Sequence, residues 1–174
     1  AEVREQDVTG ADRGGVQAVA NAAASSAAIS GLRKMRILAA EDNKTNRLVF
    51  SKLVRKLNIE LEFAENGRIA VQKWQSFQPD LVFMDISMPE MDGKQATREI
   101  RALEASDASR HTPIVALTAH AMAGDDDEIM AAGLDHYLTK PLRKAAIFER
   151  IRGATPNGVV AVFDADGADG SVNA

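Results

Sequence analysis

The sequence predicts an α/β fold in which helices cover both faces of a parallel β-sheet. Between about residues 35 and 152, short apolar runs alternate with amphipathic stretches. Strands that alternate with helices form a parallel sheet, and the helices that connect these strands cross over in the right-handed sense. Two of the apolar runs, 81–84 and 114–117, have no polar face. We therefore expect these two in the middle of a sheet that is covered on both sides.

The strands and helices are predicted from their own residue patterns, in chain order. The first strand is a short apolar run, the second alternates strictly between apolar and polar residues, and the last is the shortest. The predicted strands are 36–40, 59–63, 81–84, 114–117 and 136–138. Each is followed by a stretch with helical character. The predicted helices are 43–57, 67–77, 94–106, 125–132 and 142–152.

Four of the five helices carry apolar residues at helical spacing, and we expect Trp74 to be a core residue of the second. The fourth helix is expected to begin with three Asp residues, because carboxylates favour a helix N-terminus. The apolar stripes consist of Val49, Leu53, Leu57, Ala70, Val71, Trp74, Phe77, Ala96, Ile100, Leu103, Phe148 and Ile151.

Composition excludes several classes of protein. The 174 residues contain 21 Lys and Arg against 25 Asp and Glu, a net charge of −4, which argues against a general nucleic-acid-coating protein. Aromatic residues make up only 5%, too few for a single-strand stacking platform. The chain has no cysteine, so it has no disulfide scaffold, thiolate metal site or thiol nucleophile, and we expect a cytoplasmic location.

The two ends differ in composition from the middle. Residues 1–34 are rich in Ala, Ser and Gly and are predicted to be a linker. The uncharged stretch 14–32 is too weakly apolar for a membrane span, and the segment before it is acidic, unlike a signal peptide. We expect one domain over 35–152 and an acidic, flexible tail over 153–174, in which the apolar run 159–163 could dock on the domain or on a partner.

Polar residues stand where the predicted strands end. In a parallel sheet of this kind, ligands bind outside the carboxyl ends of the strands. The residues found there are Glu41, Asp42, Asp85, Thr118, Lys140 and Pro141. Three carboxylates, a hydroxyl and an ammonium group are therefore expected at one edge of the sheet.

Such a cluster of carboxylates needs either protons or a cation, and a divalent metal ion is the simpler solution. Two carboxylates about 4 Å apart repel by ~4 kcal/mol at an effective dielectric constant near 20. With oxygen ligands only, the expected ion is Mg²⁺ or Mn²⁺, which would leave positions open for a phosphoryl oxygen. Lys140 and Thr118 could bind further phosphoryl oxygens, and Asp85 could act as the nucleophile that forms an aspartyl phosphate.

Four motifs in this order and at this spacing resemble the receiver domain of two-component response regulators. They are Ala40-Glu41-Asp42-Asn43, the run from Met84-Asp85 to Asp92-Gly93, Leu117-Thr118-Ala119 and Tyr137-Leu138-Thr139-Lys140-Pro141. The resemblance covers residues 35–152. It implies a flavodoxin-like (βα)5 fold with strand order 2-1-3-4-5.

The resemblance also implies roles for individual residues. Asp85 would accept a phosphoryl group from a histidine kinase or a histidine phosphotransfer domain. The metal would be bound by Asp42, Asp85 and the backbone carbonyl of Ser87, with Glu41 acting through water. Lys140, Thr118 and the backbone N–H of Ala119 would contact the phosphoryl group. Thr118 and Tyr137 would form the switch pair, and the Lys140–Pro141 bond would be cis.

Finer features are typical of receivers fused to hybrid histidine kinases, namely Asn43, Asn46 and the run Ala119-His120-Ala121-Met122. We therefore expect the C-terminal receiver of such a kinase, which promotes its own phosphorylation and dephosphorylation without being a stand-alone enzyme. The alternative is a single-domain regulator that binds a partner directly. No contact with nucleic acid or membrane is expected, and a weak or phosphorylation-dependent dimer is a further expectation.

The same residues have simpler explanations when each is taken alone. Glu41 and Asp42 could cap a helix, Asp85 could end a strand, and Lys140 could be a solvated loop residue, but these explanations require a coincidence at each strand end. Asp92-Gly93 and Asn66-Gly67 are interpreted only as turns. A haloacid-dehalogenase-type phosphatase would need a second Asp where Ser87 stands. A flavin domain would need a Gly-rich loop where the first acidic pair stands.

Overall fold

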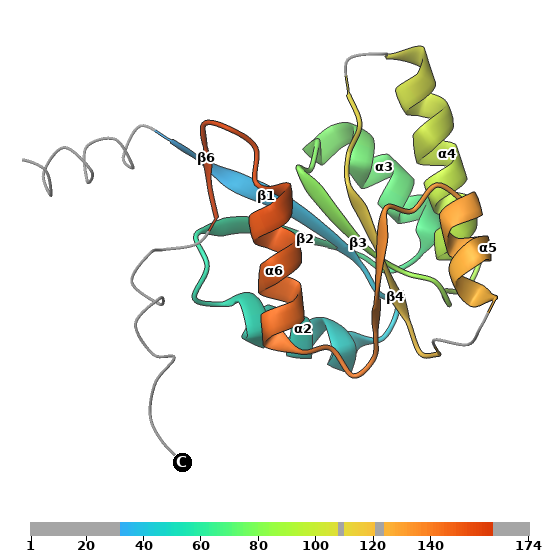
Figure 1. The fold of residues 1–174 in the computed structure, drawn as a ribbon, viewed down its shortest axis with the longest axis horizontal. Coiled ribbons are helices and arrows are strands. Elements are labelled where there is room, and N and C mark those ends of the chain that lie inside the picture. The colour runs from blue at the N-terminus through green and yellow to red at the C-terminus, as the bar shows by residue number, and fades with distance from the viewer. Residues whose placement is uncertain (1–31, 108–109, 121–123, 162–174) are drawn as a thin grey trace, which may run out of the picture. The chain divides into compact units, whose positions relative to one another are not determined.

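The computed structural model describes residues 32–107, 110–120 and 124–161. Its six-stranded sheet has the order β2-β1-β3-β4-β5, with β6 paired to β1, and all pairs are parallel (Figure 1). The strands are β1 (Arg33–Ala40), β2 (Ile59–Ala64), β3 (Leu81–Asp85), β4 (Ile114–Thr118), β5 (His136–Thr139) and β6 (Val159–Val160). The helices are α2 (Lys44–Val54), α3 (Gly67–Phe77), α4 (Gly93–Ser106), α5 (Asp125–Ala131) and α6 (Lys144–Ala154). The predicted fold class and the order 2-1-3-4-5 are confirmed.

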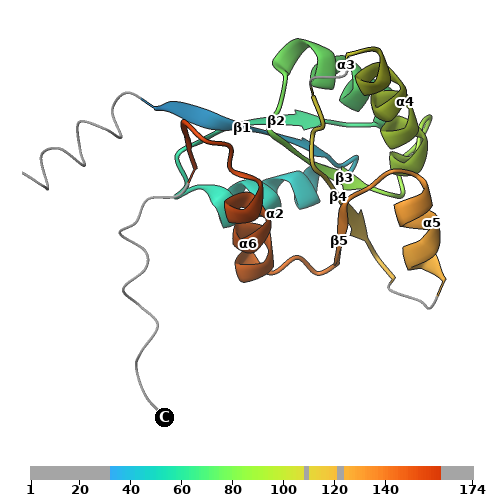
Figure 2. The ribbon, with the colours of Figure 1, turned by 45° about the horizontal axis from the view of Figure 1, so that its top comes forward.

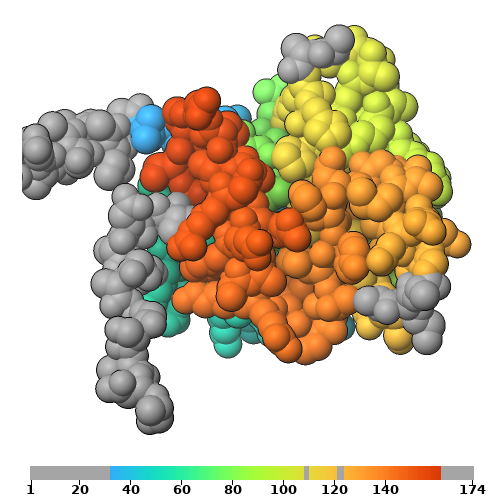
Figure 3. Space-filling view, viewed as in Figure 1, coloured from blue at the N-terminus to red at the C-terminus, as the bar shows by residue number. Residues whose placement is uncertain are grey.

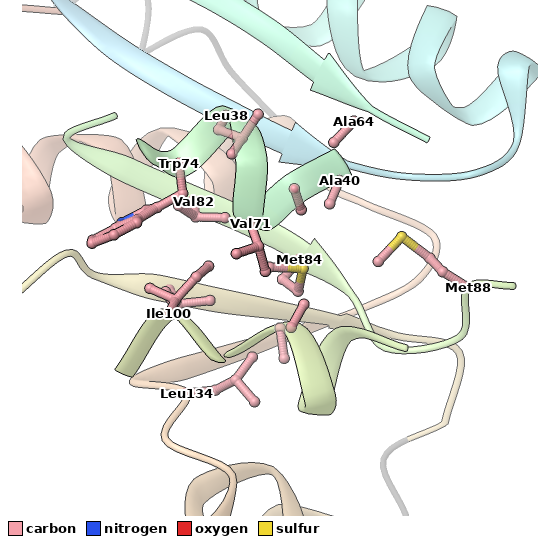
Figure 4. Packing of buried hydrophobic residues seen from close by; sticks show 14 of the residues in the cluster. Leu38, Ala40, Ala64, Val71, Trp74, Val82, Met84, Met88, Ile100 and Leu134 are labelled. Atoms are coloured by element: carbon pink, nitrogen blue, oxygen red, sulfur yellow. The ribbon is translucent and has the colours of Figure 1, made fainter. Parts of the chain in front are cut away.

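Two hydrophobic clusters lie on opposite faces of the sheet, because side chains alternate along each strand. Helices α3, α4 and α5 cover one face, and α2 and α6 cover the other (Figure 2). Figure 4 shows part of the first cluster, where Leu38 of β1 and Val82 and Met84 of β3 lie near Trp74 of α3 and Ile100 of α4. The second cluster is built around Phe83, Phe50 and Ile147. All five residues of β3 are buried, as predicted for a central strand.

Helix α2 begins one residue later than predicted and ends earlier, at Val54. Asn43 is not helical but is the N-cap residue, with φ −82° and ψ 118°, and its side chain accepts hydrogen bonds from the amides of Thr45 and Asn46. An N-cap residue keeps extended geometry because its side chain replaces the missing helical acceptors. Helix α6 also differs, since it starts at Lys144 and continues to Ala154.

The C-terminal end of the described chain forms strand β6, which lies in the strand-like apolar run 159–163 but is not among the five predicted strands of the domain. Val159 and Val160 pair with Arg33 and Lys34 of β1, and Ala161 is 2% exposed. The last described residues, in red, therefore lie beside the blue start of β1 (Figure 3).

The expected boundaries at 34 and 153 cut through β1 and α6. Of the two possibilities for the apolar run 159–163, its described residues 159–161 dock on the domain itself, where they add buried apolar surface to the core. Residues 1–31 and 162–174 lie outside the described residues.

No described helix has the length and apolarity needed to cross a bilayer.

Candidate functional site

The carboxyl ends of β1, β3 and β5 bring four of the predicted side chains together. Glu41 and Asp42 follow β1, Asp85 is the last residue of β3, and Lys140 follows β5. One carboxylate oxygen from each of Glu41, Asp42 and Asp85 lies within 4.8 Å of the others. The Nζ atom of Lys140 donates to Glu41 Oε2 at 2.8 Å and to Asp85 Oδ2 at 2.9 Å. The site is therefore an acidic cluster bridged by one ammonium group.

Burial differs among the three acids. Glu41 and Asp85 are 5% and 4% exposed, whereas Asp42 is exposed. Glu41 Oε1 accepts hydrogen bonds from the amide of Asn43 at 3.1 Å and from Asn46 Nδ2 at 3.2 Å. Asp85 Oδ1 accepts one from the amide of Ser87 at 3.1 Å. Glu41 thus accepts three hydrogen bonds and Asp85 two, once those from Lys140 are included.

This difference separates the protonation behaviour of the two buried acids. Burial raises the pKa of Asp85 above its usual range, and the hydrogen bonds from Lys140 and Ser87 only partly offset this effect. Burial also acts to raise the pKa of Glu41, but its bonds to Lys140, Asn43 and Asn46 bring that pKa below its usual range. Burial acts to lower the pKa of Lys140, but the hydrogen bonds to Glu41 and Asp85 outweigh this effect and hold that pKa above its usual range. The ion pair therefore favours the charged forms of Lys140 and Glu41, whereas burial disfavours the charged form of Asp85.

The donor set fits a hard divalent cation. Three carboxylates and one ammonium group give a formal charge of −3 + 1 = −2, which a divalent ion would neutralise. All the side-chain donors are oxygens, as Mg²⁺ prefers. Ser87, whose carbonyl is expected as a further ligand, is held next to the cluster by the hydrogen bond that its backbone amide donates to Asp85 Oδ1.

The described members of the remaining predicted residues have other partners than the three acids. The Thr118 hydroxyl donates to the carbonyl of His120 at 2.7 Å, and within the described residues no hydrogen bond joins this hydroxyl to the acids. The Tyr137 hydroxyl bonds to Asp126 on α5 at 3.2 Å, which raises the pKa of the tyrosine. Ala119 is exposed. The Lys140–Pro141 peptide bond is cis. Ala121 and Met122 lie outside the described residues.

Two contacts of the site are not predicted by the sequence pattern. A Cβ atom on Gly93 would lie 2.2 Å from the carbonyl oxygen of Asp85, so Asp92-Gly93 is more than a turn. Arg47 on α2 donates to the backbone carbonyls of Glu41 and Asp42. An arginine in a helix carries no sequence signal for backbone contacts, whereas a glycine at the start of a helix could have suggested a close approach between backbones.

Comparisons with known proteins agree with the fold. Residues 37–152 match the family model of the response regulator receiver domain. The chain is 46% identical over 110 residues to sensor protein GacS of Pseudomonas syringae pv. syringae, which covers 63% of this chain and 12% of that protein. The chain thus spans about an eighth of this relative's length.

Two solved structures share the fold. The receiver domain of sensor histidine kinase PA1611 from Pseudomonas aeruginosa PAO1, with a magnesium ion coordinated in its active site cleft, is 35% identical, with a TM-score of 0.62 over 69% of this chain and 96% of that chain. The receiver domain of Ssk1 from Saccharomyces cerevisiae, co-crystallised with the histidine phosphotransfer protein Ypd1, is 32% identical, with a TM-score of 0.62 over 69% and 88% of the two chains.

Proposed function

The chain belongs to the response regulator receiver domain family, and from this premise we propose that Asp85 accepts a phosphoryl group from a phosphohistidine in a phosphorelay. The observation that carries the proposal is the Asp85 carboxylate itself. It is 4% exposed at the end of β3, 2.9 Å from Lys140 Nζ, and grouped with two further carboxylates.

The proposed reaction is phosphoryl transfer from nitrogen to oxygen. A carboxylate oxygen of Asp85 attacks phosphorus, the P–N bond of the phosphohistidine breaks, and its electron pair stays on the imidazole nitrogen. The product is an acyl phosphate on Asp85. Lys140 would move its ammonium group from Asp85 to a phosphoryl oxygen, while Glu41 continues to hold it from the other side. The hydroxyl of Thr118 and the amide of Ala119 would donate to the other phosphoryl oxygens.

We propose that Asp42, Asp85 and the carbonyl of Ser87 hold Mg²⁺, with Glu41 acting through water. The oxygen donor set and its formal charge of −2 support this assignment, and the related PA1611 receiver has magnesium in its cleft. When bound, the ion would neutralise charge on the phosphoryl oxygens. Mn²⁺ prefers the same hard oxygen ligands and is the second candidate.

Thr118 and Tyr137 are the proposed switch residues. Thr118 would give up its bond to the His120 carbonyl and move toward the phosphoryl group, and Tyr137 would give up its bond to Asp126 and turn inward. Tyr137 is half-buried and packs against the first hydrophobic cluster, so an inward position would be adjacent to its present one.

The proposed partners are a histidine kinase and a histidine phosphotransfer domain. The related Ssk1 receiver was crystallised with such a protein, and the PA1611 receiver is part of a sensor histidine kinase. We therefore propose that this chain is the receiver of a hybrid histidine kinase in the cytoplasm, with the residues before β1 as a linker, and with any membrane attachment in the rest of the kinase. A stand-alone regulator is the second candidate.

Leu48 and Val49, 55% and 47% exposed on α2, offer apolar surface close to the site for a partner.

A phosphorylation assay tests the proposal. The protein is incubated with a small phosphodonor and Mg²⁺, and we expect an acid-stable, base-labile adduct that Asp85→Asn abolishes. Asp92→Asn is the matched control, because Asp92 is exposed and its side chain caps α4, a role that Asn also fills. Wild-type protein without such an adduct would reject the function. A kinase core encoded upstream of residue 1 would support the hybrid kinase over the stand-alone regulator.

A further inference from the structure

The first turn of α2 faces the two acids that follow β1. Asn43 caps this helix, and the next residues on the same side, three and four positions later, are Asn46 and Arg47. Neither side chain has a role in the proposed reaction. Both nevertheless bond to the Glu41–Asp42 pair.

Asn46 supports the side chain of Glu41. Its Nδ2 donates to Glu41 Oε1 at 3.2 Å, while Lys140 donates to the other oxygen at 2.8 Å. These two bonds come from α2 and from the residue after β5, and together they fix the rotation of the carboxylate. Asn46 itself is exposed, so its side chain adds little to the hydrophobic core.

Arg47 supports the backbone of both acids. Its Nη1 atom donates to the carbonyl of Glu41 at 2.9 Å and to the carbonyl of Asp42 at 2.8 Å. Two carbonyl dipoles directed at one point repel each other unless a positive group lies between them. The Nη2 atom bonds to Glu65 at 3.2 Å, so the guanidinium group also ties this loop to the one after β2. Only 16% of the Arg47 side chain is exposed.

Asp42 depends on this backbone support more than the other two acids do. Within the described part of the chain, no hydrogen bond holds the Asp42 carboxylate, whereas Glu41 and Asp85 each have several partners. The position of the Asp42 carboxylate is therefore set through its backbone. Residues that orient metal ligands in this way commonly change metal affinity by 10–100-fold when they are replaced.

We propose that Asn46 and Arg47 are positioning residues that preset Glu41 and Asp42 for a divalent cation. Asn46 orients the Glu41 carboxylate, and Arg47 fixes the carbonyls, and with them the chain direction, of the acidic pair. This inference rests on the proposed function, because it assigns these contacts to the Mg²⁺ site.

Calorimetric titration with Mg²⁺ alone, on wild-type protein and on Asn46→Ala and Arg47→Gln, tests the proposal. We expect each variant to bind Mg²⁺ at least ~10-fold more weakly. Arg47→Lys keeps the charge but lacks the guanidinium geometry that reaches both carbonyls and Glu65, so we expect it to remain weak. Full wild-type affinity in Arg47→Lys would show that only charge matters and would overturn the positioning role of Arg47.

Two controls separate this role from a general effect of charge or stability. Arg55→Gln removes the same charge from the exposed residue at the C-cap of α2 and should leave Mg²⁺ affinity unchanged. Far-ultraviolet circular dichroism and the emission of Trp74, which lies on the other face of the sheet, report whether each variant folds. Because Asn46 is exposed, its variant keeps the test informative even if Arg47→Gln does not fold.

The outcomes separate the two proposals. If wild-type protein binds Mg²⁺ and Asn46→Ala and Arg47→Gln bind it equally well, the positioning roles are wrong and the proposed function stands. If wild-type protein binds no Mg²⁺, the proposed metal site is wrong, and the inference falls with it.

Discussion

Gly93, the first residue of α4, lies against the backbone of Asp85. A Cβ atom at this position would be 2.2 Å from the Asp85 carbonyl oxygen and 2.9 Å from the Met84 side chain. The amide of Gly93 also donates to the carbonyl of Ile86 at 3.1 Å. Helix α4 and the end of β3 can therefore approach this closely only because residue 93 has no side chain.

Gly93→Ala is expected to lower the free energy of unfolding by ~2 kcal/mol, as for other overpacked sites, and to slow phosphorylation because Asp85 must shift. Urea unfolding and the phosphodonor assay measure the two effects. Gly153→Ala is the matched control, since Gly153 lies in α6 and a Cβ atom there would meet nothing within 4 Å. It should stabilise the protein by about 0.5 kcal/mol. Equal stability of the two variants would contradict the close-packing argument.

The Asp85 carboxylate is expected to destabilise the fold at neutral pH. Burial raises its pKa in the folded protein, so the folded state binds this proton more tightly than the unfolded state does. As the pH rises above the ordinary Asp range, the unfolded state ionises first and stability falls. Asp85→Asn removes the buried negative charge and should stabilise the protein by about 1 kcal/mol near neutral pH. Residues that serve function commonly lower stability in this way.

Urea unfolding of Asp85→Asn and wild type, at about pH 7 and at about pH 4.5, tests the sign of this effect. The stabilisation should shrink at the lower pH, because less of the wild-type Asp85 carboxylate is ionised there than at neutral pH. Both proteins are measured without Mg²⁺, which would otherwise favour the wild type. A wild type that is more stable than the variant at neutral pH would contradict the prediction.

At the scale of single residues, the sequence predicts the atoms of the cluster but not their support. Glu41, Asp42, Asp85 and Lys140 can be found because each follows an apolar run, and parallel strands end at the same edge of a sheet. Arg47 cannot be found in this way, because its partners are backbone carbonyls that any residue possesses. Such contacts depend on the path of the chain, which local patterns do not specify.

At the scale of elements, periodicity predicts four of the five helices and the first five strands, and an acidic first turn indicates the remaining helix, α5. The ends of these elements are predicted less accurately. The apolar stripe predicts Asn43 inside α2 although it is the N-cap, because a side chain that bonds to nearby amides does not interrupt such a stripe. Strand β6 is visible in the sequence only as an apolar run that could dock. Its two residues pair only with Arg33 and Lys34, which are expected in the linker, and a pairing so distant in sequence has no local signal.

Strand β6 is expected to stabilise the domain. Val159 and Val160 are half-buried, Ala161 is 2% exposed, and the carbonyl of Ala161 accepts a hydrogen bond from the amide of Asn58 at 2.9 Å. A chain that ends at Pro156 should therefore be less stable than one that ends at Ala161, by about 2 kcal/mol, because apolar burial, the pairing of β6 with β1 and the hydrogen bond from Asn58 are all lost. Thermal unfolding compares the two chains. Equal midpoints would show that β6 contributes nothing to the fold.

At the scale of the whole molecule, the sheet brings together groups that lie far apart in sequence. Lys140 reaches Glu41 across 99 positions and Asp85 across 55, and these contacts form only when β1, β3 and β5 are all in place. The acidic cluster therefore belongs to the folded state alone. Because the unfolded chain scatters these groups, a ligand that needs them all must bind the folded state preferentially.

Mg²⁺ is accordingly expected to stabilise the entire domain, by RT ln(1 + [Mg²⁺]/Kd), or ~2.7 kcal/mol at a hundred times the dissociation constant. Thermal unfolding across a Mg²⁺ series measures this, with NaCl at matched ionic strength to account for screening. Asp42→Asn and Asp85→Asn should each lose most of the shift, while Asp92→Asn, which changes an exposed acid at the cap of α4, should keep it. A midpoint that rises equally in all four proteins would mean that the ion acts through general screening and not at the acidic cluster.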